Sequence, residues 1–334
     1  MSPEAEAASL SSFELFSQRI IPTFTYEAPA DFVPQPGSAY LYGSTDESRA
    51  GHLATYLTEA GVATVRLAEA EDEPTTFTVE LSGQVYSVNL YSGRQQDSLW
   101  GQLDAPVVYL DITGLPHHIW APLVVSAHRA GQHLQVVYVE PANYQRSPDE
   151  VQAYDLSDGI AGISPLPGFA SLQPTGDNVC YVPLLGFEGA RFSYATGKVD
   201  PPPNKTFPVI GLPGFRPEYP FETYVANQRP LESENGQLLV NIQYADASCP
   251  FGLYYVLDAL AVRHRGDVLK VALLGTKPHA LGAVLYAMRQ GPDKVELVYD
   301  HPIRKPGRTS GIGRIYLFHV TFFLSLTSPT LAFA

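Results

Sequence analysis

Cysteine and charged residues are scarce in this chain of 334 residues. Its two cysteines, Cys180 and Cys249, exclude a disulfide framework and a Cys-x-x-Cys metal site. Lysine and arginine number 21 against 34 aspartates and glutamates, which gives a formal net charge of −13. General binding to nucleic acid backbones needs concentrated Lys and Arg, so the composition excludes it and leaves room only for a local basic site.

Long apolar runs are also absent. Residues 1–12 carry no basic group ahead of an apolar stretch and do not resemble a secretory signal. The last apolar run, Ile315 to Leu326, is interrupted by His319 and is shorter than the roughly 20 residues that span a bilayer. We expect this run to be a strand packed on both faces, in a cytoplasmic protein without a membrane segment or a metal site.

The hydrophobic residues, 45% of the chain, follow a pattern that alternates between strand and helix. In residues 38–146 the pattern predicts an α/β unit, because strands that alternate with helices pair in parallel. We expect a Rossmann-like half there, with an inserted β-hairpin at its edge. The predicted strands are 39–42, 62–67, 106–112 and 134–139, the hairpin is 75–91, and the helices are 47–60 and 117–130.

The same alternation returns in residues 237–334, which predict a second Rossmann-like half. Its predicted strands are 238–244, 268–274 and 295–299, and its predicted helices are 251–263 and one that begins after Gly275-Thr-Lys-Pro-His279. Residues 147–236 are rich in Pro, Gly and aromatic residues and are predicted to connect the halves as a lid or a wrap. Residues 1–37, with repeated prolines, are predicted to be an N-terminal arm.

Two segments echo each other. Pro116-His117 begins a predicted helix that leads to a strand and Pro141, and Pro278-His279 does the same on the way to Pro302. The turns after Tyr42 and after Tyr244 also correspond in this comparison. We infer a duplication, with chance similarity of two strand–helix–strand units as the alternative. Open α/β sheets bind ligands beyond the carboxyl ends of their strands, so the two halves are expected to share a cleft.

The strongest candidate site is the turn Gly275-Thr276-Lys277-Pro-His279, between a buried strand and a helix. A hydroxyl, an ammonium group and free backbone N–H groups at the positive end of a helix favour an anion, and phosphate is the anion we expect. The run Gly275 to Ala283 resembles the Gly-Thr-Lys turn of CARF-type (CRISPR-associated Rossmann fold) sensor domains. That resemblance implies binding of cyclic oligonucleotides in prokaryotic antiviral signalling. The alternative is a solvated Lys277 beside a hydrogen-bonded His279.

A second basic segment, Arg304 to Arg314, carries four cations among Gly, Ser and Thr. Arginine can hold phosphate with two hydrogen bonds, so Arg304, Lys305 and Arg308 are predicted to complete the nucleotide site. The segment lacks the Gly-Lys-Ser/Thr ending of a P-loop. A solvated hairpin tip is the alternative.

Catalytic signatures such as Gly-x-Ser-x-Gly or His-Glu-x-x-His are missing. The weak catalytic candidates are Asp300 with His301, at a strand end, and Cys249, at a helix start that would stabilise a thiolate. A buried structural thiol is the alternative for Cys249. No cofactor can be identified from the sequence.

Three functions follow from these patterns. The first is a nucleotide- or phosphate-responsive sensor or assembly subunit that acts on a protein partner or within a homo-oligomer. The second is a nucleotide-processing hydrolase or transferase that uses the same cleft. The third is an interaction scaffold without a ligand.

Overall fold

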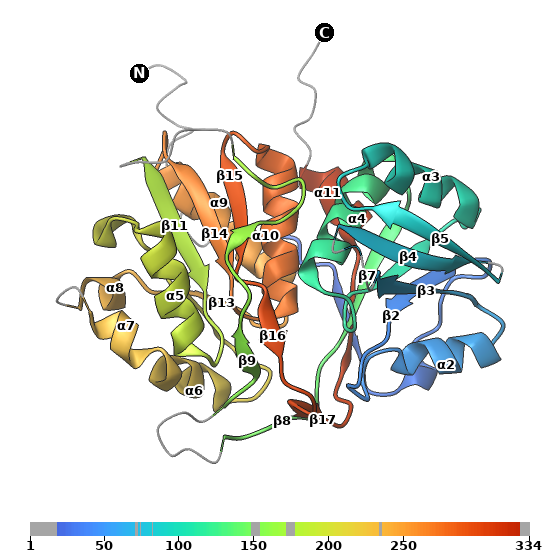
Figure 1. Ribbon diagram of the computed structural model, residues 1–334, viewed down its shortest axis with the longest axis horizontal. Helices are drawn as coiled ribbons and strands as arrows, with labels where there is room; N and C mark the ends of the chain where they lie inside the picture. The colour runs from blue at the N-terminus through green and yellow to red at the C-terminus, as the bar shows by residue number, and fades with distance from the viewer. Residues whose placement is uncertain are drawn as a thin grey trace, which may run out of the picture.

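A computed structural model describes residues 19–70, 73, 75–81, 83–147, 154–171, 178–233 and 236–327 of the protein. The chain forms two parallel-rich sheets with helices on their faces, which confirms the predicted α/β, Rossmann-like class (Figure 1). Residues 1–18 of the expected N-terminal arm lie outside the described residues. Among the described helices, none is both long and apolar enough to cross a bilayer.

The first half contains an eight-stranded sheet in the order β1-β18-β7-β6-β2-β3-β4-β5. The four middle strands, β7, β6, β2 and β3, pair in parallel. Strands β6 and β7 are buried at every position, as continuous apolar runs require when both faces of a sheet are covered. The predicted hairpin is confirmed as β4 and β5 at the sheet edge. The strands are β1 (Thr23–Tyr26), β2 (Ala39–Gly43), β3 (Ala63–Glu69), β4 (Thr76–Leu81), β5 (Gln84–Asn89), β6 (Val108–Asp111), β7 (Leu134–Val139) and β18 (Ile315–Phe318), and the helices are η2 (Pro29–Asp31), α2 (His52–Glu59), α3 (Gly93–Leu103), α4 (His117–Arg129) and α11 (Val320–Thr327).

The second half contains a six-stranded sheet in the order β10-β15-β14-β11-β12-β13. Five of these strands are parallel, and their chain order across the sheet is the Rossmann order, with β11 first and central. The strands are β10 (Ser164–Pro165), β11 (Val179–Leu184), β12 (Val209–Gly211), β13 (Gln243–Ala245), β14 (Val268–Leu273) and β15 (Val295–Tyr299), and the helices are α5 (Gly189–Val199), η3 (Pro203–Lys205), α6 (Tyr219–Ala226), α7 (Gln228–Glu232), α8 (Gln237–Val240), α9 (Pro250–Arg263) and α10 (Lys277–Gln290).

The predicted connecting segment, 147–236, is not a connection alone. It contains β11, the central strand of the second sheet, followed by α5 and β12. Pro183 lies inside β11, beside Ala272 of β14, and proline is rare in central strands because it cannot donate to the ladder. Residues 238–244, predicted to be one strand, instead form α8 and the start of the edge strand β13.

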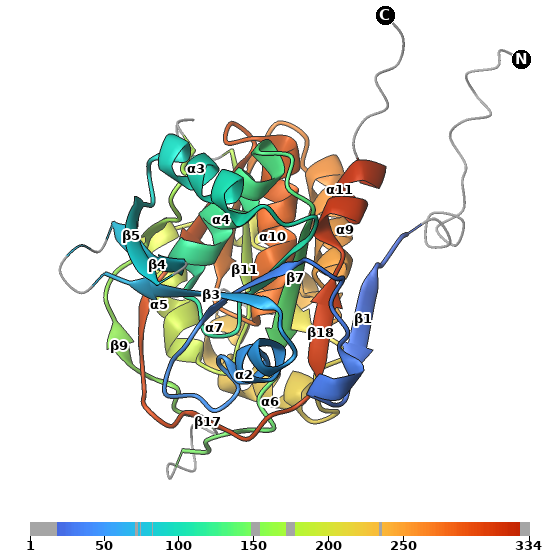
Figure 2. The ribbon, with the colours of Figure 1, turned by 90° about the vertical axis from the view of Figure 1, so that its right-hand side faces the viewer.

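The last apolar run also differs from its prediction. Only Ile315–Phe318 is a strand, and it joins the first sheet between β1 and β7 in place of closing the second (Figure 2). Helix α11 follows, and its Phe323 packs against Phe251 of α9 with ring centroids 4.4 Å apart. The C-terminal segment therefore belongs to the first half and touches the second.

Helices α4 and α10 lie side by side in the middle of the molecule (Figure 1). One core of buried residues includes Trp120 and Leu123 of α4 together with Leu281 and Leu285 of α10. Helix α4 begins at His117, as predicted, whereas α10 begins at Lys277, inside the turn predicted for Gly275 to His279. Helix α2, predicted from residue 47, begins at His52. A continuous core fixes the two halves relative to each other.

Two short antiparallel ladders cross beneath the halves. They are β9 (Ser157–Ile160) with β16 (Pro302–Arg304), and β8 (Asn143–Tyr144) with β17 (Thr309–Ser310), of which the second pair lies near the bottom of Figure 1. Arg216 donates to the Ala142 carbonyl and, at 3.0 Å, to Asn143 Oδ1, and so holds the residues before α6 against the start of β8. The crossing segments close one side of the space between the halves.

Gly282 tests how tightly α10 packs. A Cβ at this position would lie 2.2 Å from the Pro250 carbonyl oxygen of α9. We expect Gly282→Ala to lower the free energy of unfolding by about 1–3 kcal/mol, because backbone must shift to admit the methyl group. Chemical denaturation measures the change.

Gly101 of α3 provides the matched control, since no atom lies within 4 Å of the place that a Cβ would take there. At this position, Gly101→Ala should raise stability by about 0.5–1 kcal/mol through helix propensity alone. Equal effects of the two substitutions would contradict the close approach of α9 and α10.

Candidate functional site

A cavity lies where the carboxyl ends of the central strands meet. In the second sheet the chain order reverses between β11 and β14, the point at which open α/β sheets bind ligands. The turns after these strands, Gly186-Phe187 and Gly275-Thr276, line the cavity, and Arg49 and His117 reach it from the first half. The cavity volume is about 90 Å³. A space of this size holds several water molecules or a phosphate group.

Lys277 does not point to a free anion site. Its Nζ donates to the carbonyl oxygens of Ile112, Thr113 and Leu115 in the first half, at 2.6, 2.7 and 2.7 Å. An ammonium group has three donors, so all of them are engaged. The prediction that Lys277 contacts phosphate is therefore wrong for this arrangement, and Lys277 instead clamps the second half onto the first.

The surroundings of the Lys277 clamp disfavour its charge. Burial, with Arg49 next in effect, lowers the pKa of Lys277 well below its ordinary value, whereas Glu47 acts in the opposite direction. Burial removes the water that would stabilise the charge of Lys277, and the three carbonyl dipoles stabilise that charge instead. Without them, the halves would enclose an unsatisfied ammonium group.

The other residues of the predicted turn are divided between two roles. Gly275 and Thr276 line the cavity, and Thr276 caps α10 by accepting from the His279 N–H at 3.3 Å. A Cβ on Gly275 would lie 2.7 Å from the Leu185 carbonyl oxygen, so the turn needs glycine. His279 is fully buried, and its Nε2 lies 3.0 Å from the Asp246 carbonyl oxygen, which is the hydrogen-bonded alternative that the sequence left open.

Arg304 is the cation that the cavity leaves without a carboxylate. In the described part of the chain, its side chain forms no ion pair, and its hydrogen-bond partner is the Tyr299 hydroxyl at 3.2 Å. Burial, with Arg191 and Arg308 nearby, lowers the pKa of Arg304. Arginine nevertheless stays charged at neutral pH. Its remaining donors favour an anion in the cavity.

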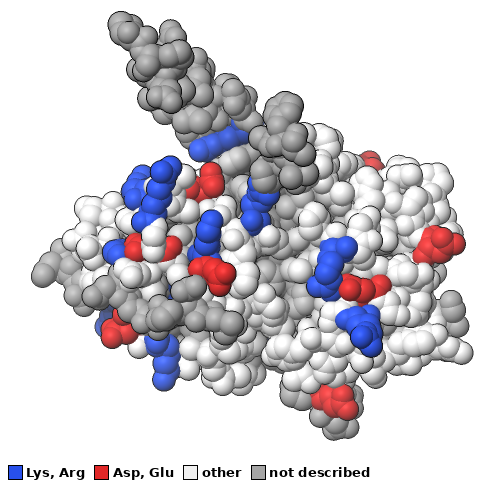
Figure 3. Space-filling view, turned by 90° about the horizontal axis from the view of Figure 1, so that it is seen from above, with Lys and Arg blue, Asp and Glu red and all other residues white. Residues whose placement is uncertain are grey.

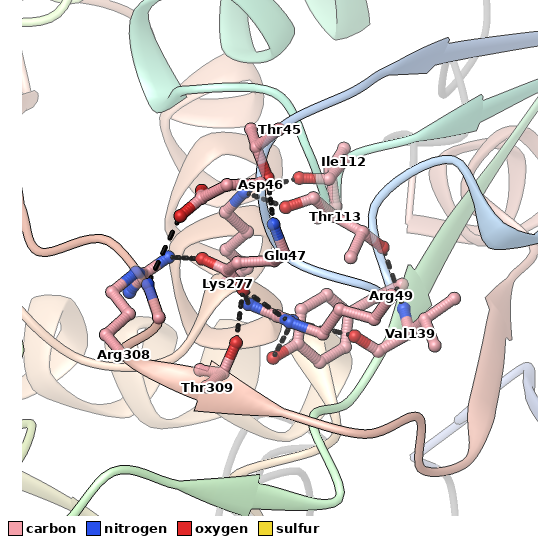
Figure 4. A network of polar contacts seen from close by, with 12 residues as sticks. Thr45, Asp46, Glu47, Arg49, Ile112, Thr113, Val139, Lys277, Arg308 and Thr309 are labelled. Atoms are coloured by element: carbon pink, nitrogen blue, oxygen red, sulfur yellow. Dashed lines mark hydrogen bonds and ion pairs between the residues drawn. The ribbon is translucent and has the colours of Figure 1, made fainter.

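Arg308 and Lys305, predicted to act with Arg304, have different surroundings. Arg308 lines the cavity and pairs with Glu47, which also binds Arg49 at 2.7 Å (Figure 4). Lys305 instead pairs with Asp155 outside the cavity, and Asp158 lies 3.8 Å away. Lys305 is therefore not brought to the site.

Asp300 and His301 do not form an acid–base pair. Asp300 is fully buried and accepts from Arg191 Nε and Nη2 at 2.6 and 2.7 Å. His301 Nε2 lies 2.9 Å from the Ser164 hydroxyl, and His301 adopts a left-handed φ of 43°. Asp300 positions Arg191, whose side chain lines the cavity.

Cys249 has the properties of a structural thiol. It precedes α9, its side chain is buried, and burial raises its pKa. A reactive cysteine needs the opposite shift. The expected thiolate at this helix start is not supported.

His117 brings a neutral polar group to the cavity. It is 3% exposed, and its Nε2 has no hydrogen-bond partner among the described residues. Burial, together with Lys277 and Arg304, lowers its pKa well below the ordinary value, so the ring is neutral at pH 7. Its ring lies against Tyr299, with centroids 4.5 Å apart.

Aromatic side chains also line the cavity. Tyr144, Phe187, Phe215 and Tyr219 line the cavity, and Tyr219 meets Phe187 edge to face at 5.1 Å. Aromatic faces and arginines in one cavity match a ligand with a flat ring and a phosphate.

The sequence interpretation missed Arg191, Glu188 and Phe187 because they follow β11 in the segment predicted to be irregular. The available signal was the apolar run from Val179 to Leu185 before Gly186, a strand followed by a turn. The echo was assigned correctly for α4 and α10. For the first turn it was wrong, because the strand equivalent to the central β2 is β11 and not β13.

The outer face that Figure 3 shows carries charges of both signs, with Lys and Arg among Asp, Glu and many uncharged residues. Among the described residues, no group of three or more His, Cys, Asp or Glu could hold a metal ion.

No protein-family model matches the sequence, and no curated protein matches it. Among solved structures, the chain is similar to CobK precorrin-6A reductase, with 14% sequence identity and a TM-score of 0.23 over 82% of this chain and 91% of that chain. A similarity at this TM-score carries no argument about function. The interpretation of the cavity therefore depends on its own geometry.

The clamp predicts that Lys277 is essential for stability. We expect Lys277→Met to lower the free energy of unfolding by about 2–4 kcal/mol, because buried carbonyl oxygens lose a charged donor. Urea denaturation measures the loss. Lys305→Met is the matched control, since Lys305 pairs at the surface, and its stability should stay close to that of the unchanged protein. A small effect of Lys277→Met would show that the carbonyls are not held by this ammonium group.

The buried His279 predicts a loss of stability in acid. Burial lowers its pKa from 6.5 to about 4. As the pH falls from 6.5 to 4, the unfolded chain takes up a proton that the folded chain does not, so stability should fall by up to about 3 kcal/mol. Above pH 6.5 this contribution does not change.

Glutamine at position 279 does not titrate, and its amide nitrogen can take the place of Nε2 and donate to the Asp246 carbonyl. The difference in unfolding free energy between the unchanged protein and His279→Gln should therefore vary between pH 6.5 and 4 and be constant above. A difference that is flat across this window would rule out a buried neutral His279.

Proposed function

We propose that the cavity binds a phosphorylated nucleotide and that the protein is a nucleotide-responsive sensor or assembly subunit. The observation that carries this proposal is Arg304, a cation at the switch point of a Rossmann-ordered sheet with no carboxylate partner in the described chain. A ligand phosphate would give Arg304 the counterion that the protein does not supply.

The other cavity residues support a nucleotide more than a simple inorganic anion. At the start of α10 the Lys277 N–H lacks an intrahelical acceptor and can attract phosphate, whereas Pro278 carries no N–H and Thr276 caps the N–H of His279. Phe187 and Tyr219 offer aromatic surface for a base. The neutral His117 can exchange a hydrogen bond with a ligand hydroxyl or base.

The arrangement favours binding over turnover. The catalytic candidates Asp300, His301 and Cys249 are engaged in structural contacts, and none of them lines the cavity. A site that offers phosphate donors and that none of these three candidates lines suits a sensor, in which ligand binding changes the contact between two halves.

The resemblance of Gly275 to Ala283 to CARF-type sensors supports a cytoplasmic role in prokaryotic antiviral defence, with a protein partner or a second copy of the chain receiving the signal. Lys277 departs from a ligand-binding role, since its donors are occupied. In this proposal the arginines hold the ligand, and the contact of Lys277 with the first half changes when ligand binding moves the two halves relative to each other.

Thermal shift with ATP, linear and cyclic oligoadenylates, NAD and UDP-glucose tests the proposal. At least one of these should raise the Tm, and Arg304→Gln should weaken its binding by about 10–100-fold, the value of a charge-assisted hydrogen bond. Product analysis of the same mixtures should show the nucleotide unchanged.

Arg129→Gln is the matched control, because Arg129 is an exposed arginine of α4 that pairs with Asp97 outside the cavity. It makes the same charge change and should leave binding as it is. Turnover of a nucleotide would favour the processing enzyme, and no shift with any ligand would favour the scaffold.

A further inference from the structure

Glu47 is a buried carboxylate at the edge of the cavity. It lies in the turn between β2 and α2, is 9% exposed, and faces two arginines that line the cavity. Arg49 Nε and Nη2 donate to its Oε2 at 2.8 and 2.7 Å, and Arg308 donates to Oε1. The Thr309 hydroxyl donates to Oε2 at 2.8 Å. Two guanidinium groups and a hydroxyl therefore surround one carboxylate (Figure 4).

This set of donors is also suited to a phosphoryl group. Arginine forks and hydroxyls bind carboxylates and phosphates with the same geometry, and a phosphate accepts more hydrogen bonds with more charge. Arg49 is 3% exposed, and its Nη1 donates to the Val139 carbonyl at 2.7 Å, so the arginine is held in place independently of Glu47. Arg49 would therefore stay in position if the carboxylate left.

Glu47 also fastens a crossing segment. Residues 305–310, here called the strap, run from β16 to β17 beneath the two halves. Arg308 and Thr309 of the strap bind Glu47, and the Gly307 N–H donates to Asp46 Oδ2 at 3.2 Å. The strap therefore contacts the first half through the same carboxylate that fills the arginine pair.

We propose that Arg49 and Arg308 form a phosphoryl subsite which the Glu47 carboxylate fills as an intramolecular ligand, and that a phosphoryl group of the nucleotide replaces it and releases the strap from Asp46 and Glu47. This inference rests on the proposed function, because it assigns one phosphoryl group of the same ligand. It identifies the ligand as one with a terminal phosphoryl group in addition to the phosphate held by Arg304, such as a nucleoside diphosphate or an oligonucleotide with a terminal phosphate.

The charges explain how a phosphoryl group would replace the Glu47 carboxylate at the two arginines. The two arginines lower the pKa of Glu47 to about 2 against the opposing effect of burial. At neutral pH the group that competes with the ligand is therefore a carboxylate with a single negative charge. A terminal phosphoryl group brings close to two charges. The exchange leaves both arginines neutralised and frees the Glu47 side chain to turn toward solvent.

The test measures the dissociation constant of inorganic pyrophosphate by calorimetry and amide hydrogen exchange over residues 305–310 in the intact chain. In the unchanged protein, pyrophosphate should speed exchange in the strap. Glu47→Gln should tighten pyrophosphate binding by about tenfold or more and speed exchange before pyrophosphate is added. Arg308→Gln should also speed exchange, but it should weaken binding.

Asp155→Asn is the control for charge and for strap contacts, since Asp155 pairs with Lys305 and touches neither arginine of the subsite. It should leave pyrophosphate affinity unchanged. If Glu47→Gln does not fold, Glu47→Asp keeps the charge and all the donors but shortens the side chain, and it should still speed strap exchange and tighten binding.

The outcomes separate the two proposals. Pyrophosphate binding that neither speeds strap exchange nor responds to Glu47→Gln would overturn the subsite while leaving the proposed function intact. An equal gain from Glu47→Gln and Asp155→Asn would reduce the effect to net charge and would also overturn it. A lack of any binding of nucleotide to the unchanged protein would instead overturn the proposed function.

Discussion

The arrangement of the two halves depends on one ammonium group held by three carbonyl oxygens. Lys277 begins α10, and Ile112, Thr113 and Leu115 precede α4, so the contact joins the starts of the two central helices. The packing of α4 on α10 excludes water from this contact, which makes an unpaired ammonium group there costly. The apolar core sets the helices side by side, and the Lys277 contact fixes how their ends meet.

A protein with a large negative charge concentrates cations at this junction. The cavity is lined by Arg49, Arg191, Arg308, Arg304 and Lys277, and the carboxylates that contact them are Glu47, Glu188 and Asp300. Each of the first three has a carboxylate partner, Lys277 has carbonyls, and Arg304 has the Tyr299 hydroxyl. Burial of charge on this scale is unfavourable for stability alone. A binding role for the cavity provides a physical reason for it.

The fold class and most element positions were accessible from the sequence, because strands buried on both faces and amphipathic helices leave a local period. The helix that begins at His117 and the edge hairpin are examples. Two failures have a common cause. Proline is rare in central strands, so Pro183 disfavours a strand at the place where the structure has β11. For β18, no local feature of the sequence indicates which of the two sheets it joins. In both, long-range pairing outweighed local preference.

The sequence alone determined that the chain is an α/β protein with two Rossmann-like parts, and that a Gly-Thr-Lys turn and an arginine-rich segment stand near strand ends. Only the tertiary structure decided what each cation meets. Lys277 and the Ile112 carbonyl are 165 positions apart, and Glu47 and Arg308 are 261 apart. Residue type sets which partners a side chain accepts, whereas the packing of distant segments sets which partner is within reach. The arginine left without a carboxylate at the cavity is therefore a property of the fold and not of its local sequence.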